Sequence, residues 1–188
     1  QGQLIAQTNG ITVFTGTFSG QVKAVITKYG QKIVPGDVFM MNNPFEGGTH
    51  LCDICVVNPI FDSQKLIGFA VAIAHWSEIG GMSAGSLPPG ATEIFQEGIR
   101  FPALRLFSAG VRQEEVFEII AANSRLPKMS IGDLNAQLAA VRIADVRLKE
   151  ITEKYTYDIL KRSFNHILDT SEKLSVAALR QMPNGVYK

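Results

Sequence analysis

The chain has 188 residues, enough for one large domain or two small ones, and its 18 basic and 17 acidic residues nearly cancel. A net charge of +1 gives no field that would attract nucleic acid or an anionic membrane surface, so we expect neither as a partner. Only 19% of the residues are charged whereas 46% are hydrophobic, which indicates burial against another protein. No apolar run is long enough for a membrane helix, and the two cysteines form no disulfide framework, so a cytoplasmic location is expected.

Glycine and proline divide the chain into two regions. Residues 1–110 hold 15 of the 17 glycines and six of the eight prolines. This distribution predicts an α+β fold, with a mixed, mainly antiparallel, glycine-rich sheet region over 1–110 and a helical region over 111–188. The chain lacks an initiator Met and a signal peptide, and it ends in a turn that leads into an unfinished strand. We therefore expect a fragment of a larger subunit.

In the first region, short β-branched and aromatic runs predict five strands and one helix. Val22, Val25 and Ile26 recur at helical spacing, Ser19 is a candidate N-cap, and Gly30 is placed to close the helix. The strands are expected over residues 11–14, 38–41, 54–60, 66–75 and 104–107.

In the second region the apolar residues follow a 3.6-residue period. A short helix around residues 116–120 should end before Pro127, and Ser130 with Asp133 matches a helix start signal for a long helix. A break is expected near Tyr155, followed by a last helix to about Met182. This tail has no dense basic stripe, which favours a solvated amphipathic helical pair over a nucleic-acid-binding face.

Two histidines and an aspartate are the candidate metal ligands. Gly47 and Gly48 precede His50 and Asp53, which can share a metal only if the chain turns between them. His75 ends an apolar strand and is followed by a loop with Gly80 and Gly81. His50, Asp53 and His75 would form a two-histidine, one-carboxylate set that suits Mn, Fe or Zn. The alternative is a pair of hydrogen-bonded histidines and a turn aspartate.

Two further motifs have ordinary structural explanations. Cys52 and Cys55 match C-x-x-C, but residues 54–57 read as a strand and no second such pair exists, which favours buried apolar cysteines. Ser83 lies in a G-x-S-x-G match, the nucleophile elbow of serine hydrolases, with His166 downstream. The prolines and glycine at 88–90 prevent the helix that an elbow requires, so a serine hydrolase is a distant alternative.

Glu93 and Glu97 are the candidate acid–base residues. If residues 91–98 form one helical turn, the two carboxylates share a face, where like charges repel and one pKa rises towards the range of a general acid. The simpler alternative is a solvated turn. The chain has neither a P-loop nor a dinucleotide-binding fingerprint, so nucleotide chemistry must come from another chain.

The order of these motifs resembles the hydantoinase B family, which includes the B-type part of ATP-dependent 5-oxoprolinase and N-methylhydantoinase and the α subunit of acetone carboxylase. The resemblance extends over nearly the whole chain. The residues that carry it are Pro35-Gly36-Asp37-Val38-Phe39, Asn42, Pro44, Gly47-Gly48-Thr49-His50, Asp53, Ala74-His75, Gly80-Gly81-Met82, Gly85-Ser86, Pro88-Pro89, Ala91 to Gly98 and Gly132-Asp133-Leu134.

This resemblance implies a two-component enzyme in which ATP is held by an A-type partner subunit, which phosphorylates a carbonyl or amide oxygen. The B-type subunit would hold a divalent metal, for which His50, Asp53 and His75 correspond to ligands, and would complete lactam hydrolysis or ketone carboxylation. Such an enzyme is a hetero-oligomer. The alternative is a non-catalytic subunit-interaction module whose excess of apolar residues reflects packing against other subunits, and the isolated fragment is expected to be inactive.

Overall fold

The computed structural model describes residues 2–8 and 10–186, which form two compact units divided between Lys149 and Glu150. The long helix α3 begins in the first unit and ends in the second. In chain order the elements are α1 (Thr12–Tyr29), η1 (Gly30–Lys32), β1 (Val38–Met41), η2 (Pro44–Glu46), β2 (Asp53–Asp62), β3 (Lys65–His75), η3 (Ile94–Gln96), β4 (Leu104–Ser108), β5 (Val111–Arg112), α2 (Glu114–Ala122), α3 (Pro127–Tyr155) and α4 (Tyr157–Leu179).

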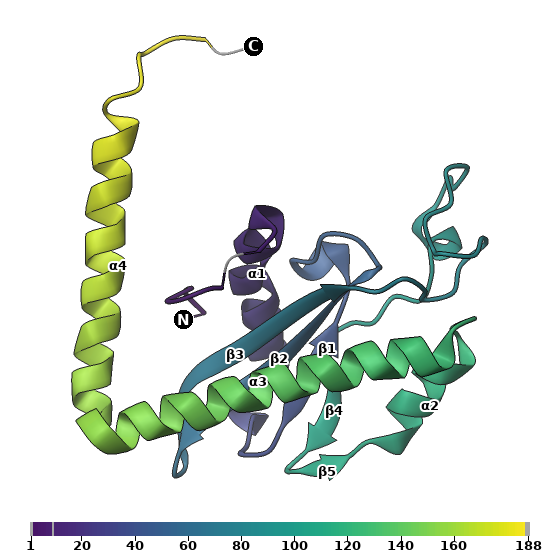
Figure 1. Cartoon of the computed structure of the whole chain (residues 1–188), viewed down its shortest axis with the longest axis horizontal. Helices are drawn as coiled ribbons and strands as arrows, with labels where there is room; N and C mark the ends of the chain where they lie inside the picture. Colours follow the sequence, from purple (N-terminus) through teal and green to yellow (C-terminus); the bar gives the residue numbers. More distant parts are fainter. Residues whose placement is uncertain (1, 9, 187–188) are drawn as a thin grey trace. The chain divides into compact units, whose positions relative to one another are not determined.

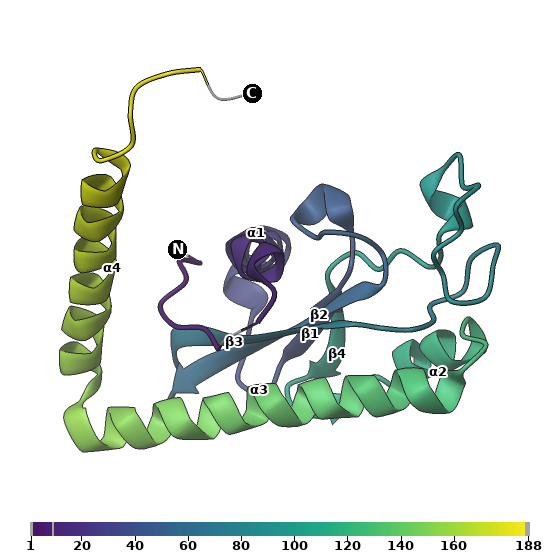
Figure 2. The same cartoon turned by 45° about the horizontal axis from the view of Figure 1, so that its top comes forward.

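The first unit is built on a five-stranded sheet in the order β3-β2-β1-β4-β5, and each pairing is antiparallel. Helix α1 covers one face of the sheet, and α2 and α3 cover the other (Figures 1 and 2). The predicted α+β class is therefore confirmed. The predicted strands over 38–41, 54–60, 66–75 and 104–107 correspond to β1, β2, β3 and β4, whereas the two-residue β5 was not predicted.

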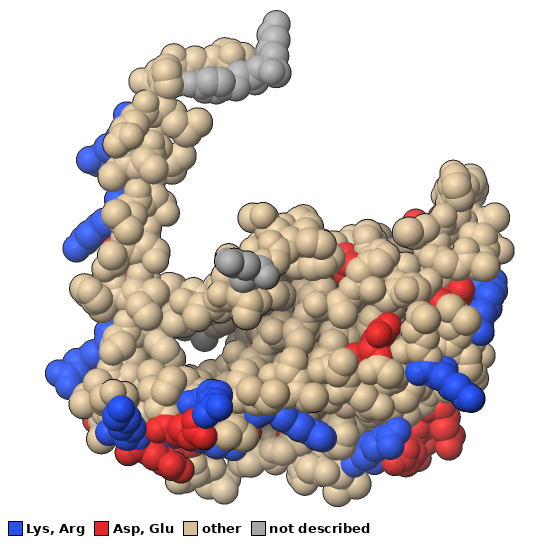
Figure 3. Space-filling model, viewed as in Figure 1, with Lys and Arg blue, Asp and Glu red and all other residues tan. Residues whose placement is uncertain are grey.

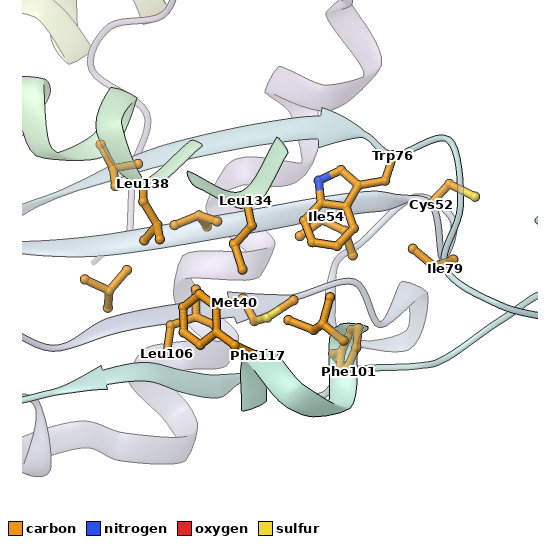
Figure 4. Packing of buried hydrophobic residues seen from close by; sticks show 14 of the residues in the cluster. Met40, Cys52, Ile54, Trp76, Ile79, Phe101, Leu106, Phe117, Leu134 and Leu138 are labelled. Carbon is orange, nitrogen blue, oxygen red and sulfur yellow. The ribbon is translucent and has the colours of Figure 1, made fainter. Parts of the chain in front are cut away.

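The central strands bury both of their faces, which produces two hydrophobic cores. Alternate residues of β1 point to opposite sides, so Met40 packs under α2 and α3 whereas Phe39 packs under α1. Figure 4 shows the first of these cores, with Leu134 and Leu138 of α3 over the sheet. The sheet is thus held rigidly between helices, and loops leave it at the end where β2 begins and β3 ends.

The strand expected over residues 11–14 is wrong, because helix α1 already begins at Thr12. Phe18 and Phe14 lie one and two turns before Val22 on the half-buried side of the helix, so packing of one helical face overrides the β-propensity of this run. Ser19 accordingly lies inside the helix and is not its N-cap. Gly30, by contrast, ends the helix with a φ of 49°.

Helix α3 begins at Pro127 rather than at the predicted start signal of Ser130 and Asp133. Proline suits the first position of a helix because its missing N–H would have no partner there. The break expected near Tyr155 is confirmed: Thr156 has a φ of 65° and separates α3 from α4. No described helix is long and apolar enough to cross a lipid bilayer.

Candidate metal centre

The loop before β2 provides the turn that His50 and Asp53 need in order to face one another. The Asp53 amide donates to the His50 carbonyl oxygen at 3.0 Å, which closes a turn directly before the strand. Gly47 has a φ of 93° and its backbone lies against Gly20 of α1. A Cβ atom on Gly47 would lie 2.8 Å from the Gly20 carbonyl carbon, so only glycine permits this close approach.

Strand pairing brings the third residue to the same place. Asp53, the first residue of β2, is directly opposite His75, the last residue of β3. Side chains at opposite positions of an antiparallel pair lie on the same face of the sheet and contact one another. His50, Asp53 and His75 are therefore assembled by one turn and one pair of strands.

The three side chains form a compact cluster around a buried carboxylate. Asp53 is inaccessible to solvent, and its two oxygens lie 3.2 Å from His50 Nδ1 and 3.1 Å from His75 Nδ1. The Thr49 hydroxyl also donates to the Asp53 carboxylate. The two imidazole rings meet edge to face with their centroids 4.9 Å apart, and their side chains are 44% and 40% exposed. The histidines thus form the solvent-facing side of the cluster.

The cluster has the donor set of a divalent metal site. One potential ligand atom from each of the three residues lies within 4.8 Å of the other two. His50 Nδ1 is buried and has no hydrogen-bond partner, because its contact with Asp53 is short but lacks hydrogen-bond geometry. A buried ring nitrogen without a partner is costly unless something else uses its lone pair. Two imidazoles and one carboxylate fit Mn, Fe or Zn.

Gly80 and Gly81 lie in the loop that follows β3, where both have positive φ values. A Cβ atom on Gly80 would lie 2.7 Å from the Asn123 carbonyl oxygen, and one on Gly81 would lie 2.7 Å from the Gln96 carbonyl oxygen. Gly48 is similarly close to the backbone of Asn43. These glycines allow the loops to lie directly on neighbouring backbone.

Glu78 organises this same loop, although no sequence pattern pointed to it. Its carboxylate is 2% exposed and accepts hydrogen bonds from the amides of Gly80 and Gly85, from the Ser86 hydroxyl and from Arg125. Burial raises the pKa of Glu78, but the hydrogen bonds from Gly85, Gly80 and Ser86, together with the Arg125 charge, outweigh burial and lower its pKa overall. Glu78 is thus held as a buried anion.

Glu93 and Glu97 lie at the two ends of the short helix η3 and are not part of the three-residue cluster. Glu93 is exposed and caps η3 in a reciprocal arrangement with Gln96. Glu97 follows the helix, close enough to Cys52 to raise the pKa of that thiol. An acid–base role for the two glutamates is therefore a proposal that rests on sequence alone.

The two cysteines are buried and free, and they lie in different hydrophobic cores. Burial raises the pKa of Cys52 to about 11, and Asp53, Glu78 and Glu97 add to the shift. Burial also raises the pKa of Cys55. Both groups therefore remain protonated thiols at neutral pH, as expected of apolar core cysteines and not of a redox pair.

The surroundings of Ser83 do not form a nucleophile elbow. Ser83 lies in a loop, with neither a strand directly before it nor a helix directly after it within the described residues 76–93. His166, the proposed partner, lies on α4 in the other compact unit. The serine-hydrolase alternative has no support in this geometry.

The comparison with known proteins agrees with the motifs. The model of the family described as hydantoinase B/oxoprolinase matches residues 1–188. The chain belongs to this family. Its members include the putative B-type subunit of a D-/L-hydantoinase from Pseudomonas sp. (strain NS671), which is 33% identical over 189 residues that cover 98% of this chain and 32% of the relative. The chain thus spans about a third of the length of that relative.

Two solved structures resemble this hydantoinase B family member. The ATP-dependent caprolactamase from Pseudomonas jessenii is 31% identical and superimposes with a TM-score of 0.88, over 92% of this chain and 30% of that chain. A nucleotide-free structure of acetone carboxylase is 21% identical, with a TM-score of 0.73 over 78% of this chain and 20% of the other. The second similarity shows the fold alone. The family model, the hydantoinase relative and the caprolactamase structure confirm the resemblance that the sequence motifs indicated.

Proposed function

We propose that this chain is the metal-binding portion of the B-type subunit of an ATP-dependent amidohydrolase that opens a hydantoin, lactam or oxoproline ring, or of a related ketone carboxylase. The observation that carries the proposal is the cluster of His50, Asp53 and His75, with ligand atoms within 4.8 Å of one another. The names of its relatives, a hydantoinase and a caprolactamase, support cyclic amides as the substrate class.

The three residues of the cluster have distinct roles in this proposal. Each neutral imidazole offers one nitrogen lone pair, and the buried Asp53 carboxylate supplies the negative charge. Thr49 holds one oxygen of Asp53 and so restricts the rotation of the carboxylate. A bound Mn, Zn or Fe ion would polarise a substrate carbonyl or lower the pKa of a bound water. The partial exposure of both histidines leaves the cluster open to a substrate.

ATP enters the proposal only through an A-type partner subunit, in a cytoplasmic hetero-oligomer. This chain has no P-loop motif of its own, whereas its caprolactamase relative is described as ATP-dependent. Glu93 and Glu97 are the proposed acid–base residues, on the evidence of the sequence motif.

Metal analysis of the purified full-length protein tests this proposal. We expect close to one Mn, Zn or Fe ion per chain after growth in metal-supplemented medium, and less metal as the buffer is acidified, because protons compete for the imidazole nitrogens. His75→Ala should lose the metal and keep its fold, because His75 ends β3 and is partly exposed.

The matched control is His166→Ala, which changes an exposed histidine on α4. This variant should retain its metal and its stability. Equal metal loss in the two variants, or a wild-type protein that binds none of the three metals, would contradict the proposed site and favour a non-catalytic interaction module.

A further inference from the structure

Gln137 of α3 is a buried side chain that joins the two strands carrying the candidate metal ligands. It is 5% exposed and makes three hydrogen bonds. Its Nε2 donates to the carbonyl oxygens of Ile54 on β2, at 2.8 Å, and of Ala72 on β3, at 3.0 Å. Its Oε1 accepts from Trp76 Nε1 at 2.9 Å. One amide therefore connects β2, β3 and the residue that follows β3.

Two of these three partners lie next to a ligand residue in the chain, and the third, Ala72, lies three residues before His75 on β3. Ile54 follows Asp53, and Trp76 follows His75, at the point where the paired strands end. The Trp76 amide continues the pairing by one further bond, to the Cys52 carbonyl oxygen at 2.7 Å. Beyond this point both segments leave the sheet, so the position of the last pair depends on what holds it from the α3 side.

The surroundings of Gln137 are apolar, so its hydrogen bonds strongly restrict the position of its amide group. Its neighbours on the same face of α3 are the buried side chains of Leu134, Leu138 and Val141. Figure 4 shows the Trp76 indole and Ile54 in the same apolar cluster as Leu134 and Leu138. A polar group that moves here loses a hydrogen bond without gaining one from water. Both amide hydrogens and the oxygen of Gln137 are used, so displacement in any direction is opposed.

We propose that Gln137 is a positioning residue for the metal site: it fixes the alignment of Asp53 and His75 by holding Ile54, Ala72 and Trp76 in place. Gln137 touches none of the three ligands and acts through the backbone beside them. The inference rests on the proposed function, namely that His50, Asp53 and His75 bind one divalent ion.

The test compares two α3 variants of the full-length protein. Gln137→Met keeps the side-chain length and removes the amide, whereas Leu134→Ala, one turn away, leaves a cavity in the same cluster without touching the amide bonds. The affinity of metal-free protein for Mn²⁺ and Zn²⁺ is measured by competition with a chelator, and the unfolding midpoint is measured without metal.

We expect Gln137→Met to bind metal about 10–100-fold more weakly than wild type. Leu134→Ala should lower the unfolding midpoint and keep its metal affinity. Unchanged affinity in Gln137→Met, or an equal loss in Leu134→Ala, overturns the positioning role while the metal site itself stands. A wild-type protein that binds neither ion refutes the proposed function, and with it the positioning role of Gln137.

A second variant keeps the inference testable even if Gln137→Met does not fold. Trp76→Phe removes the indole N–H and retains an aromatic ring in the core, so it breaks one of the three bonds of Gln137. Trp76→Phe should weaken metal binding by a smaller factor than Gln137→Met. A protein that carries both substitutions should bind metal no more weakly than Gln137→Met alone, because the two residues act through one contact. Unchanged metal affinity in Trp76→Phe, or fully additive losses of affinity in the double variant, contradicts the proposal that Gln137 acts through Trp76.

Discussion

The loops at the ligand-bearing end of the sheet and helix α4 use polar side chains in opposite ways. In the loops, buried polar groups have several partners each: Asn42 is inaccessible to solvent and bonds to Leu51, Ile99 and Phe101. On α4, polar side chains such as Glu172 are exposed. Buried polar groups are costly unless every one is paired, so they fix a single geometry, whereas exposed ones leave the backbone free of such constraints. Substitutions in the two regions should therefore differ sharply in effect.

The largest effect is expected where the loop lies against helix α1. Gly47→Ala would place a Cβ atom within 3.0 Å of the backbone of Gly20 and Gln21, at a residue whose φ is 93°. A left-handed conformation alone costs a non-glycine residue about 1–2 kcal/mol, and the backbone contact adds to this. We expect a loss of more than about 2 kcal/mol in the free energy of unfolding, measured with urea.

Gly16→Ala is the matched control on the same helix. Gly16 lies within α1, and a Cβ atom there would meet nothing within 4 Å. This variant should gain about 0.5–1 kcal/mol, because alanine favours a helix over glycine. A Gly47→Ala protein as stable as wild type would show that the loop does not depend on its contact with α1.

The sequence was sufficient to predict those features that depend on local patterns. Four strands, the break near Tyr155 and the fold class follow from periodicity, glycine and proline. The strand expected over 11–14 failed because this run is the start of helix α1, whose Val22 and Val25 pack against sheet residues far along the chain. Propensity cannot identify a surface that only the folded sheet provides.

The candidate site likewise has residues that the sequence could identify and residues that it could not. The motif order, and not spacing alone, pointed to His50, Asp53 and His75, and the turn and strand register place them together. Glu78 and Gln137 could not be singled out, because a glutamate after a strand and a glutamine on a helix are ordinary in sequence. Their importance comes from burial and from partners as distant in the chain as Arg125 and Ile54.

An intermediate effect is expected from the buried anion in the loop that follows β3. Glu78→Gln retains the shape of the side chain but leaves Arg125 and one of the loop amides without a good acceptor, which should cost about 1–3 kcal/mol at neutral pH. The pKa of Glu78 is lowered in the folded protein. Its contribution is therefore fully present above the ordinary glutamate pKa of 4.5 and is lost as the pH falls through the lower folded value.

Urea unfolding at neutral pH and at a series of values below 4.5 measures this dependence. The difference between wild type and Glu78→Gln should shrink as the solution becomes more acidic. Glu172→Gln on α4 changes an exposed carboxylate and should show no such difference at any pH. A gap between wild type and Glu78→Gln that is independent of pH would mean that shape, and not charge, makes Glu78 important.

The smallest effect is expected for an ion pair that has a similar distance to Glu78–Arg125 but a more exposed carboxylate. Lys149 lies 2.8 Å from Asp145 on the adjacent turn of α3, and the Asp145 side chain is 23% exposed, whereas that of Glu78 is 2% exposed. Basic and acidic side chains lie next to each other along the part of the surface that carries α3 (Figure 3), so losing one partner leaves water and other charges nearby. Lys149→Met should therefore change the free energy of unfolding by no more than about 0.5 kcal/mol, and added salt should remove even that difference. A salt-independent loss as large as that of Glu78→Gln would show that α3 depends on its surface charges as the loops depend on their buried ones.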